Sequence, residues 1–179
     1  WGSVLAYDMV TLAQKGAIGN PEHGVTNIAV ADLDGNGSAE LLWGAGATST
    51  GPDHLYVANW TTKNIVWQNE DLVGPFVGPA AGDLDGDGKT EIVFASTSSD
   101  ADYGSGRIIV LDGQTLAVRG ISPGVVGDLS WTGLRDLKLR DINGDGRPEI
   151  LIAADYLYDG VVEAYSFSAN NRFNMVWTN

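Results

Sequence analysis

The sequence contains no cysteine, and only 10 of its 179 residues are Lys or Arg, against 23 Asp or Glu. The absence of cysteine excludes disulfide bonds, thiolate catalysis and Cys-ligated zinc, and it leaves the redox compartment open. The shortage of basic residues argues against nucleic acid and anionic membranes as partners, because both are bound through an excess of Lys and Arg.

Long hydrophobic runs are also missing. No stretch approaches the roughly 18 consecutive apolar residues that a membrane-spanning helix needs, so no membrane span is expected. The first residue is Trp1 and no basic-then-apolar leader precedes it, which indicates a processed or excised piece of a longer protein. The Ser elbow, the HExxH motif and the phosphate-cradling Gly loop are absent as well, so no familiar catalytic motif is found.

The acidic residues are concentrated in three short stretches of the form D-x-[DN]-G-[DN]-G-x-x-E, which together hold ten of the 23. They occupy residues 32–40, 83–91 and 141–149, and each runs directly into a hydrophobic triplet. Their first Asp residues are 51 and 58 positions apart. A period near 50 residues indicates a repeat architecture.

Short runs typical of β-strands recur in step with the acidic stretches. One run precedes each stretch, at residues 27–31, 77–82 and 136–140. Two runs joined by a polar turn follow it, at 54–58 with 64–67, 107–111 with 115–118, and 161–165 with 173–177; a similar pair, 3–7 with 11–14, opens the chain. The turns begin at Asp8, Asn59, Asp112 and Ser166. These runs are rich in β-branched and aromatic residues, and no segment keeps a 3.6-residue period, so the chain is predicted to be all-β.

Four strands in about 50 residues are typical of a β-propeller blade. The expected organisation is one partial propeller region over 1–179, with a half-blade at 1–24 and blades at 25–75, 76–132 and 133–179. Propellers generally close with ~4–8 blades, so about three and a half four-stranded antiparallel blades predict a segment of a larger propeller. Association of copies to close the ring is the alternative. A flat β-sandwich is a second structural alternative, but it does not explain the repeat.

The acidic stretches have the composition of a site for a hard cation. Their side chains at positions 1, 3, 5 and 9 are all Asp, Asn or Glu, and glycines at positions 4 and 6 allow a tight turn. Ca²⁺ takes ~6–8 oxygen ligands, whereas Zn²⁺ prefers nitrogen or sulfur and Mg²⁺ prefers a smaller octahedral cage. The alternative is that these stretches are ordinary Asp-Gly turns without a metal, but three stretches with matching spacing favour metal binding. The EF-hand is excluded because its acid stands at position 12 between helices.

The three loops and their flanks resemble the FG-GAP/VCBS repeats of calcium-binding β-propellers, such as those of integrin α-chain heads and many bacterial secreted proteins. All three loops here end in Glu, where integrin-like loops usually end in Asp, and the Phe-Gly and Gly-Ala-Pro signatures survive only faintly at 74–79, which favours the bacterial type. The resemblance implies about three Ca²⁺ ions, with the residue at position 7 contributing its carbonyl. The implied ligand sets are Asp32, Asp34, Asn36, Ser38 and Glu40; Asp83, Asp85, Asp87, Lys89 and Glu91; and Asp141, Asn143, Asp145, Arg147 and Glu149.

Because Asn replaces Asp once in the first and once in the third loop, the Asp83 loop is expected to bind most tightly. Extracellular calcium modules bind at ~10⁻⁴–10⁻³ M, so a secreted or cell-surface setting is expected. The expected role is an interaction or adhesion module with a protein or glycan ligand on the propeller face or its loops.

The sequence is compatible with two other functions. Propellers of this kind occur in polysaccharide lyases and phospholipases, so part of a secreted polysaccharide-active enzyme is one. The two histidines, His23 and His54, are interpreted as exposed loop residues, and no catalytic residue is assigned. Carbohydrate binding by aromatic stacking is the other, with Trp60 and Trp131 as candidates. Trp43, Trp67 and Trp177 are interpreted as core residues.

Overall fold

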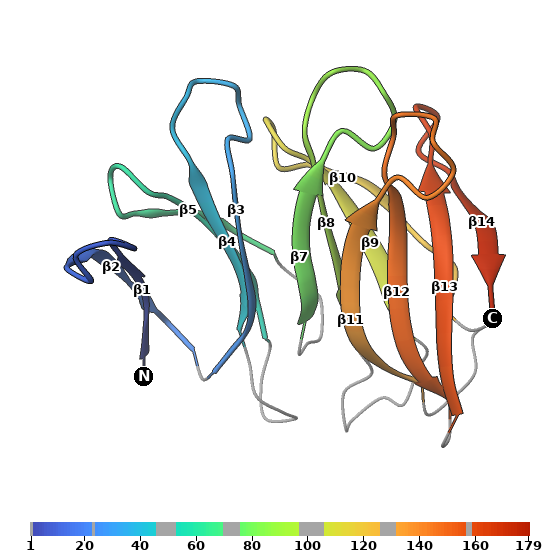
Figure 1. The fold of residues 1–179 in the computed structure, drawn as a ribbon, viewed down its shortest axis with the longest axis horizontal. Helices are drawn as coiled ribbons and strands as arrows, with labels where there is room; N and C mark the ends of the chain where they lie inside the picture. The colour runs from blue at the N-terminus through green and yellow to red at the C-terminus, as the bar shows by residue number, and fades with distance from the viewer. Residues whose placement is uncertain are drawn as a thin grey trace.

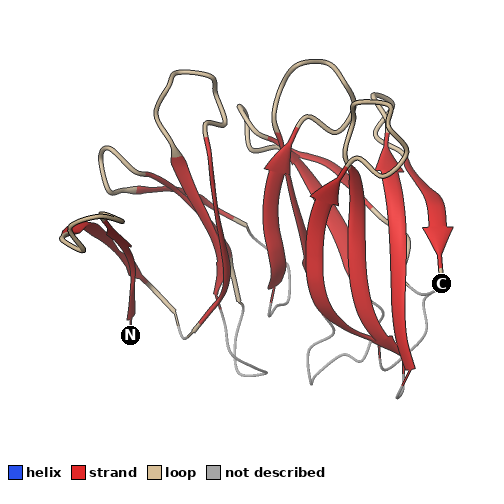
Figure 2. Cartoon of the chain, viewed as in Figure 1, coloured by secondary structure: helices blue, strands red, loops and turns tan. Residues whose placement is uncertain are grey.

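The computed structural model describes residues 2–22, 24–45, 53–69, 76–96, 106–125, 132–156 and 159–179. Over these residues the chain is all-β and contains no helix (Figure 2). Within the same ranges no helix is both long and apolar enough to cross a lipid bilayer.

The strands form a two-stranded hairpin followed by three four-stranded sheets, each antiparallel and each ordered along the chain. The N-terminal hairpin consists of β1 (Gly2–Tyr7) and β2 (Gln14–Asn20). The first sheet contains β3 (Val25–Ala31), β4 (Glu40–Ala45), β5 (Leu55–Asn59) and β6 (Ile65–Gln68). The second contains β7 (Phe76–Gly82), β8 (Glu91–Ser96), β9 (Arg107–Asp112) and β10 (Val118–Ile121). The third contains β11 (Thr132–Arg140), β12 (Glu149–Tyr156), β13 (Asp159–Phe167) and β14 (Phe173–Thr178).

The sheets stand side by side, and β7 contacts both β3 and β11, the first strands of its neighbours (Figure 1). The loops that carry the acidic stretches join the first and second strand of each sheet, and all three lie at the same edge of the molecule, uppermost in Figure 1. This arrangement of four-stranded antiparallel sheets agrees with the predicted propeller blades.

The strand period of two gives the second sheet two apolar faces. Ile92 and Phe94 of β8 pack in the core shared with the first sheet, and the alternate residues Val93 and Ala95 pack in the core shared with the third. All four side chains are fully buried. The middle sheet is thus held on both faces, as its nearly continuous hydrophobic strands require.

A third core joins the N-terminal hairpin to the first sheet. Val4 and Ile18 of the hairpin pack against Trp43 and Tyr56, whose rings stack with centroids 5.3 Å apart. The prediction that Trp43 is a core residue is confirmed, since its side chain has no exposed surface. Trp67 is partly buried against the core that the first and second sheets share. Trp177 is 49% exposed, so its core interpretation is wrong: no sheet packs beyond the third in the part of the chain that is described.

The strands that follow two of the hairpin turns begin later in the chain than the sequence predicts. Asp8 and Asp112 each accept backbone N–H bonds from the residues two and three positions on, and the backbone N–H of Leu12 and of Leu116 closes each turn. Leu12 and Leu116 have positive φ, 57° and 60°, which lies outside the extended region of β-strands. The predicted strands at 11–14 and 115–118 therefore begin at Gln14 and Val118 instead. The last turn begins at Ser168 rather than Ser166.

Candidate metal sites in the acidic loops

The three acidic loops fold by the same set of local hydrogen bonds. The position 1 carboxylate accepts the backbone N–H of the position 6 glycine, and the side chain at position 5 accepts the N–H of position 7. The distances for the first contact are 2.8 Å for Gly37 to Asp32, 2.9 Å for Gly88 to Asp83 and 2.9 Å for Gly146 to Asp141. For the second they are 2.7, 2.9 and 2.8 Å. The alternating Asp and Asn residues therefore curl the backbone around their own side chains.

Glycine makes this curl possible at positions 4 and 6. In the first loop, Gly35 and Gly37 have φ values of 74° and 84°, and the same two positions are also left-handed in the second and third loops. A residue with a Cβ would be strained in that conformation, so the two glycines of the motif are needed for backbone shape.

The Glu at position 9 closes each loop from the start of the second strand. Its Oε2 accepts the backbone N–H of position 2, at 3.1 Å for Leu33, 2.8 Å for Leu84 and 2.9 Å for Ile142. Glu40, Glu91 and Glu149 are all buried. A buried carboxylate is costly unless hydrogen bonds and an opposite charge compensate it, so these three acids need partners.

The other carboxylate oxygen of each Glu has a different partner in each loop. Oε1 of Glu40 accepts the side-chain amide of Asn59 at 3.1 Å, and Oε1 of Glu149 accepts that of Asn143 at 2.7 Å. Oε1 of Glu91 accepts from Arg119 of β10 at 2.8 Å, and the same guanidinium donates to Oδ2 of Asp85 at 2.6 Å. The second loop alone therefore receives a full positive charge at its Glu, within the described residues.

Burial and the neighbouring charges shift the pKa values of Glu91 and Arg119. Burial raises the pKa of the Glu91 carboxyl, and the hydrogen bond from Leu84 and the charge of Arg119 lower it only in part. Burial lowers the pKa of Arg119, but the hydrogen bonds and charges of Asp85 and Glu91 outweigh it and raise the pKa above its usual value. Arg119 is therefore a permanent cation in the second loop.

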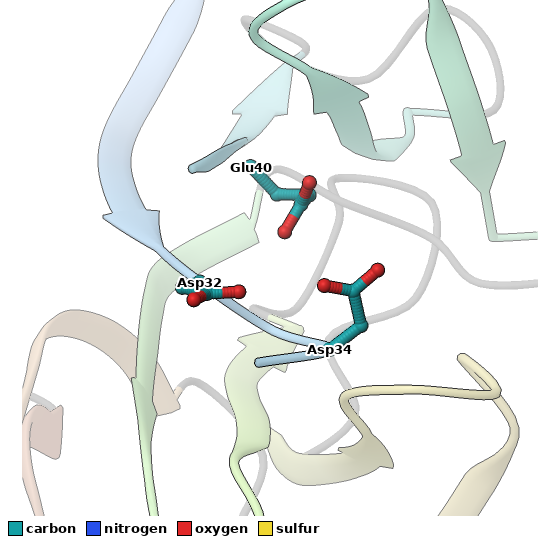
Figure 3. A group of neighbouring side chains, drawn as sticks. All are labelled: Asp32, Asp34 and Glu40. Atoms are coloured by element: carbon teal, nitrogen blue, oxygen red, sulfur yellow. The ribbon is translucent and has the colours of Figure 1, made fainter. Parts of the chain in front are cut away.

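Two of the three loops bring three carboxylates together. Asp32, Asp34 and Glu40 place one oxygen each within 4.8 Å of one another, and their carboxylates face a common space (Figure 3). Asp83, Asp85 and Glu91 form the matching group in the second loop. The third loop, fully described, forms no such group, because position 3 is Asn143 and supplies an amide. Asp87, the fourth acid of the second loop, lies outside its group.

The donor set fits a hard cation. Two oxygens on opposite sides of a Ca²⁺ ion at ~2.4 Å are about 4.8 Å apart, so oxygens within 4.8 Å of one another are close enough to bind a single ion. All the candidate donors in these groups are oxygens, as Ca²⁺ and Mg²⁺ prefer. The two groups do not include four further predicted acids of the loops, Asp87, Asp141, Asp145 and Glu149. The amide and backbone carbonyl ligands stay predictions: Asn36, Ser38, Lys89, Asn143 and Arg147.

Cavities adjoin the first and third loops. One of about 170 Å³ is lined by Asp34, Glu40 and Val66, together with residues of the 113–116 turn in the second sheet. The other, of about 250 Å³, is lined by Asn143, Asp145, Glu149 and Asn174. In both sheets the cavity therefore lies between the acidic loop and the fourth strand.

A cluster that the sequence did not predict lies where the N-terminal hairpin meets the first sheet. Glu22 pairs with Nδ1 of His54 and accepts the hydroxyl of Tyr56 at 2.8 Å. The interpretation of His54 as an exposed loop residue is wrong, since its side chain is only 18% exposed. Burial and the neighbouring Glu22 raise the pKa of the Tyr56 hydroxyl. Glu22 and His54 are 32 residues apart and belong to no motif, so nothing in the sequence paired them.

Of the two tryptophans predicted as candidates for sugar stacking, the structure describes Trp60. Trp60 is partly buried against the core of the N-terminal hairpin, and the ammonium group of Lys63 lies over its ring. One face of that ring is thus covered by the chain itself. Trp131 and His23 lie outside the described residues.

Residues 83–152 match the sequence profile of the FG-GAP-like repeat. The matched segment starts at the first Asp of the second acidic loop and ends within β12, so it contains both the second and the third loop. Together with the four-stranded antiparallel sheets, this match supports propeller blades of the FG-GAP kind. A comparison with curated protein sequences gives no match.

Proposed function

We propose that the chain is a calcium-binding propeller module of the FG-GAP/VCBS type, in which Ca²⁺ holds the loop between the first two strands of each sheet. The observation that carries the proposal is the first loop, where three carboxylate oxygens lie within 4.8 Å of one another. Among the described residues, no Lys or Arg forms an ion pair with Asp32, Asp34 or Glu40. A bound cation would supply the positive charge that this group lacks.

The proposal extends to all three loops, with one ion each. The shared hydrogen bonds place the same backbone positions around each loop, which supports a common ligand pattern from positions 1, 3, 5, 7 and 9. In the third loop Asn143 replaces the Asp at position 3 and no group of three carboxylates forms, so this loop is proposed to bind most weakly. Ca²⁺ is favoured over Mg²⁺ because flexible loops rich in carboxylates accommodate its larger and less regular coordination shell.

We further propose that the module works outside the cell, as an interaction or adhesion domain. Extracellular calcium modules bind with Kd values of ~10⁻⁴–10⁻³ M, an affinity suited to a setting rich in Ca²⁺. The β1–β2 turn supports a role in contacting other molecules, because Met9, Val10 and Leu12 are 94%, 90% and 74% exposed there. Adjacent apolar side chains left in water are typical of contact surfaces.

Calorimetric titration of the EDTA-treated protein with CaCl₂ tests the metal proposal. We expect saturable binding and a higher melting temperature, with Ca²⁺ preferred over Mg²⁺. At Ca²⁺ ~10-fold above Kd, each site contributes about 1.4 kcal/mol of stability, or roughly 3–6 °C for a chain of this size. A protein that shows neither heat of binding nor a change in melting temperature would rule the proposal out.

A glycan array tests whether the partner is a carbohydrate. The protein is applied with Ca²⁺ and with EDTA, and a Trp60→Ala variant serves as a control for stacking on that ring. Calcium-dependent glycan binding that Trp60→Ala leaves intact would point to the loops rather than to Trp60. Absence of glycan binding would favour a protein ligand.

A further inference from the structure

Arg119 occupies a position that the internal repeat makes comparable between sheets. It stands three residues after Leu116, the residue of positive φ in its turn. The same offset from Lys63 and from Asn171 gives Val66 in the first sheet and Asn174 in the third. In the N-terminal hairpin the offset from Leu12 gives Lys15. The four equivalent positions therefore carry four different side chains.

The equivalent residues face the acidic loop of their own sheet. Val66 lines the cavity beside Asp34 and Glu40, and Asn174 lines the cavity beside Asn143 and Glu149. In the second sheet, Arg119 reaches from this position into the loop and bonds to Asp85 and Glu91. At this position of the repeat, the first sheet has an apolar residue that lines a cavity, Val66, whereas the second sheet has a cation that pairs with the acidic loop, Arg119.

Two further contacts hold the guanidinium of Arg119 in place. Its Nε donates to Oδ1 of Asn171 at 3.0 Å, and its charge lies 5.3 Å from the ring centroid of Phe167. Only 16% of the side chain is exposed, and the side chains of Asp85 and Glu91 are 1% exposed. Two of the three carboxylates grouped in the second loop are therefore already paired with one hydrogen-bonded cation, whose single charge they share.

We propose that Arg119 determines the calcium affinity of the second loop by occupying two of its carboxylates, which makes this loop a weaker site than the first. This inference rests on the proposed calcium function. It reverses the order expected from carboxylate number, which favoured the Asp83 loop. The physical reason is competition: Ca²⁺ must either displace the guanidinium or bind beside a like charge, whereas the first loop offers its acids unpaired.

Two reporter proteins isolate the loops. In the second-loop reporter, Glu40→Gln and Glu149→Gln silence the first and third loops; in the first-loop reporter, Glu91→Gln and Glu149→Gln silence the second and third. Each is titrated calorimetrically with CaCl₂, with near-ultraviolet circular dichroism as the check of folding. An opposite charge at ~4–6 Å shifts the proton affinity of a carboxyl by ~10- to 1000-fold, and we expect a change of at least about 10-fold for Ca²⁺.

In the second-loop reporter, Arg119→Met is expected to tighten Ca²⁺ binding at least ~10-fold. Lys15→Met is the matched control, because it removes one positive charge at the equivalent position of a hairpin without an acidic loop, and it is expected to leave the affinity unchanged. In the first-loop reporter, Val66→Arg is expected to weaken binding by a similar factor. Val66 is 55% exposed, so the larger side chain fits without repacking the core.

The outcomes separate the two proposals. If neither reporter nor the wild-type protein binds Ca²⁺, the calcium function fails and this inference with it. If the first-loop reporter binds but Arg119→Met leaves the second loop unchanged or weaker, the role of Arg119 alone is overturned. Should Arg119→Met fail to fold, Val66→Arg decides: unchanged affinity in the first loop overturns the inference.

Discussion

The indole N–H of Trp43 donates to Oδ1 of Asn20 at 3.0 Å, across the boundary between the N-terminal hairpin and the first sheet. The amide of Asn20 also donates to the backbone carbonyls of Glu22 and Gly24, at 2.8 and 2.6 Å. Asn20 and Trp43 are both buried. One side chain therefore bonds to three polar groups that connect two parts of the fold, and one of them is the buried indole N–H of Trp43.

Replacing Asn20 by Ala should destabilise the protein by about 1–3 kcal/mol, because the indole N–H would be left buried without an acceptor. Urea denaturation followed by tryptophan fluorescence measures the change. Asn64→Ala, at an exposed position, is the matched control and should change the free energy of unfolding by less than ~0.5 kcal/mol. Equal effects of the two variants would show that the Trp43 contact contributes nothing.

Gly37 of the first loop provides a test of the backbone conformation. A Cβ at Gly37 would meet no atom within 4 Å, but φ there is 84°, so Gly37→Ala should cost about 1–2 kcal/mol through backbone strain alone. Gly19→Ala is the control, since a Cβ at Gly19 is equally free of contacts and the backbone is not left-handed. Urea denaturation in EDTA compares them, and a Gly37→Ala protein as stable as Gly19→Ala would contradict the role of φ.

The acidic loops and most strands could be predicted from the sequence because their signals are local. Asp, Asn and Gly at fixed offsets within nine residues specify both the curl of the backbone and the oxygen donors. Alternating apolar residues specify the strands, although the left-handed Leu12 and Leu116 displaced two strand starts, since Leu rarely adopts positive φ.

Contacts between distant segments could not be predicted in the same way. Arg119 meets Asp85 and Glu91 across separations of 34 and 28 residues, and neither Val66 nor Asn174 at equivalent positions suggests an arginine there. Likewise, the exposure of Trp177 depends on whether another sheet packs over it, and the sequence of β14 does not indicate this.

Asp8 provides a prediction about pH. The backbone N–H of Thr11 foremost, then the side-chain ammonium of Lys15 and the backbone N–H of Val10, lower the pKa of its carboxyl from 3.8 to about 2. Its contribution to stability is thus fully present above pH ~4, where the unfolded chain is also ionised, and is lost as the pH falls through about 2. An NMR titration of the Asp8 carboxyl carbon measures the value directly. In Lys15→Met the pKa should rise only in part, and a return to 3.8 would contradict the dominant role of the Thr11 N–H.

Glu40 should separate metal binding from loop closure. Gln at this position keeps an oxygen that can accept the Leu33 N–H, but it removes the negative charge that a cation needs. Glu40→Gln should therefore weaken the tightest Ca²⁺ site at least ~10-fold, while the melting temperature in EDTA stays the same or rises, because a buried charge without a cationic partner is removed.

Calorimetry with CaCl₂ and thermal denaturation with and without EDTA provide the two readouts for this variant. Glu163→Gln is the matched control, since Glu163 is also buried but lies in β13, away from the acidic loops, and accepts the Tyr165 hydroxyl at 2.6 Å. It should leave Ca²⁺ affinity unchanged. A Glu40→Gln protein with wild-type affinity would show that this carboxylate only closes the loop, whereas one that loses stability in EDTA would show that the charge itself is needed for folding.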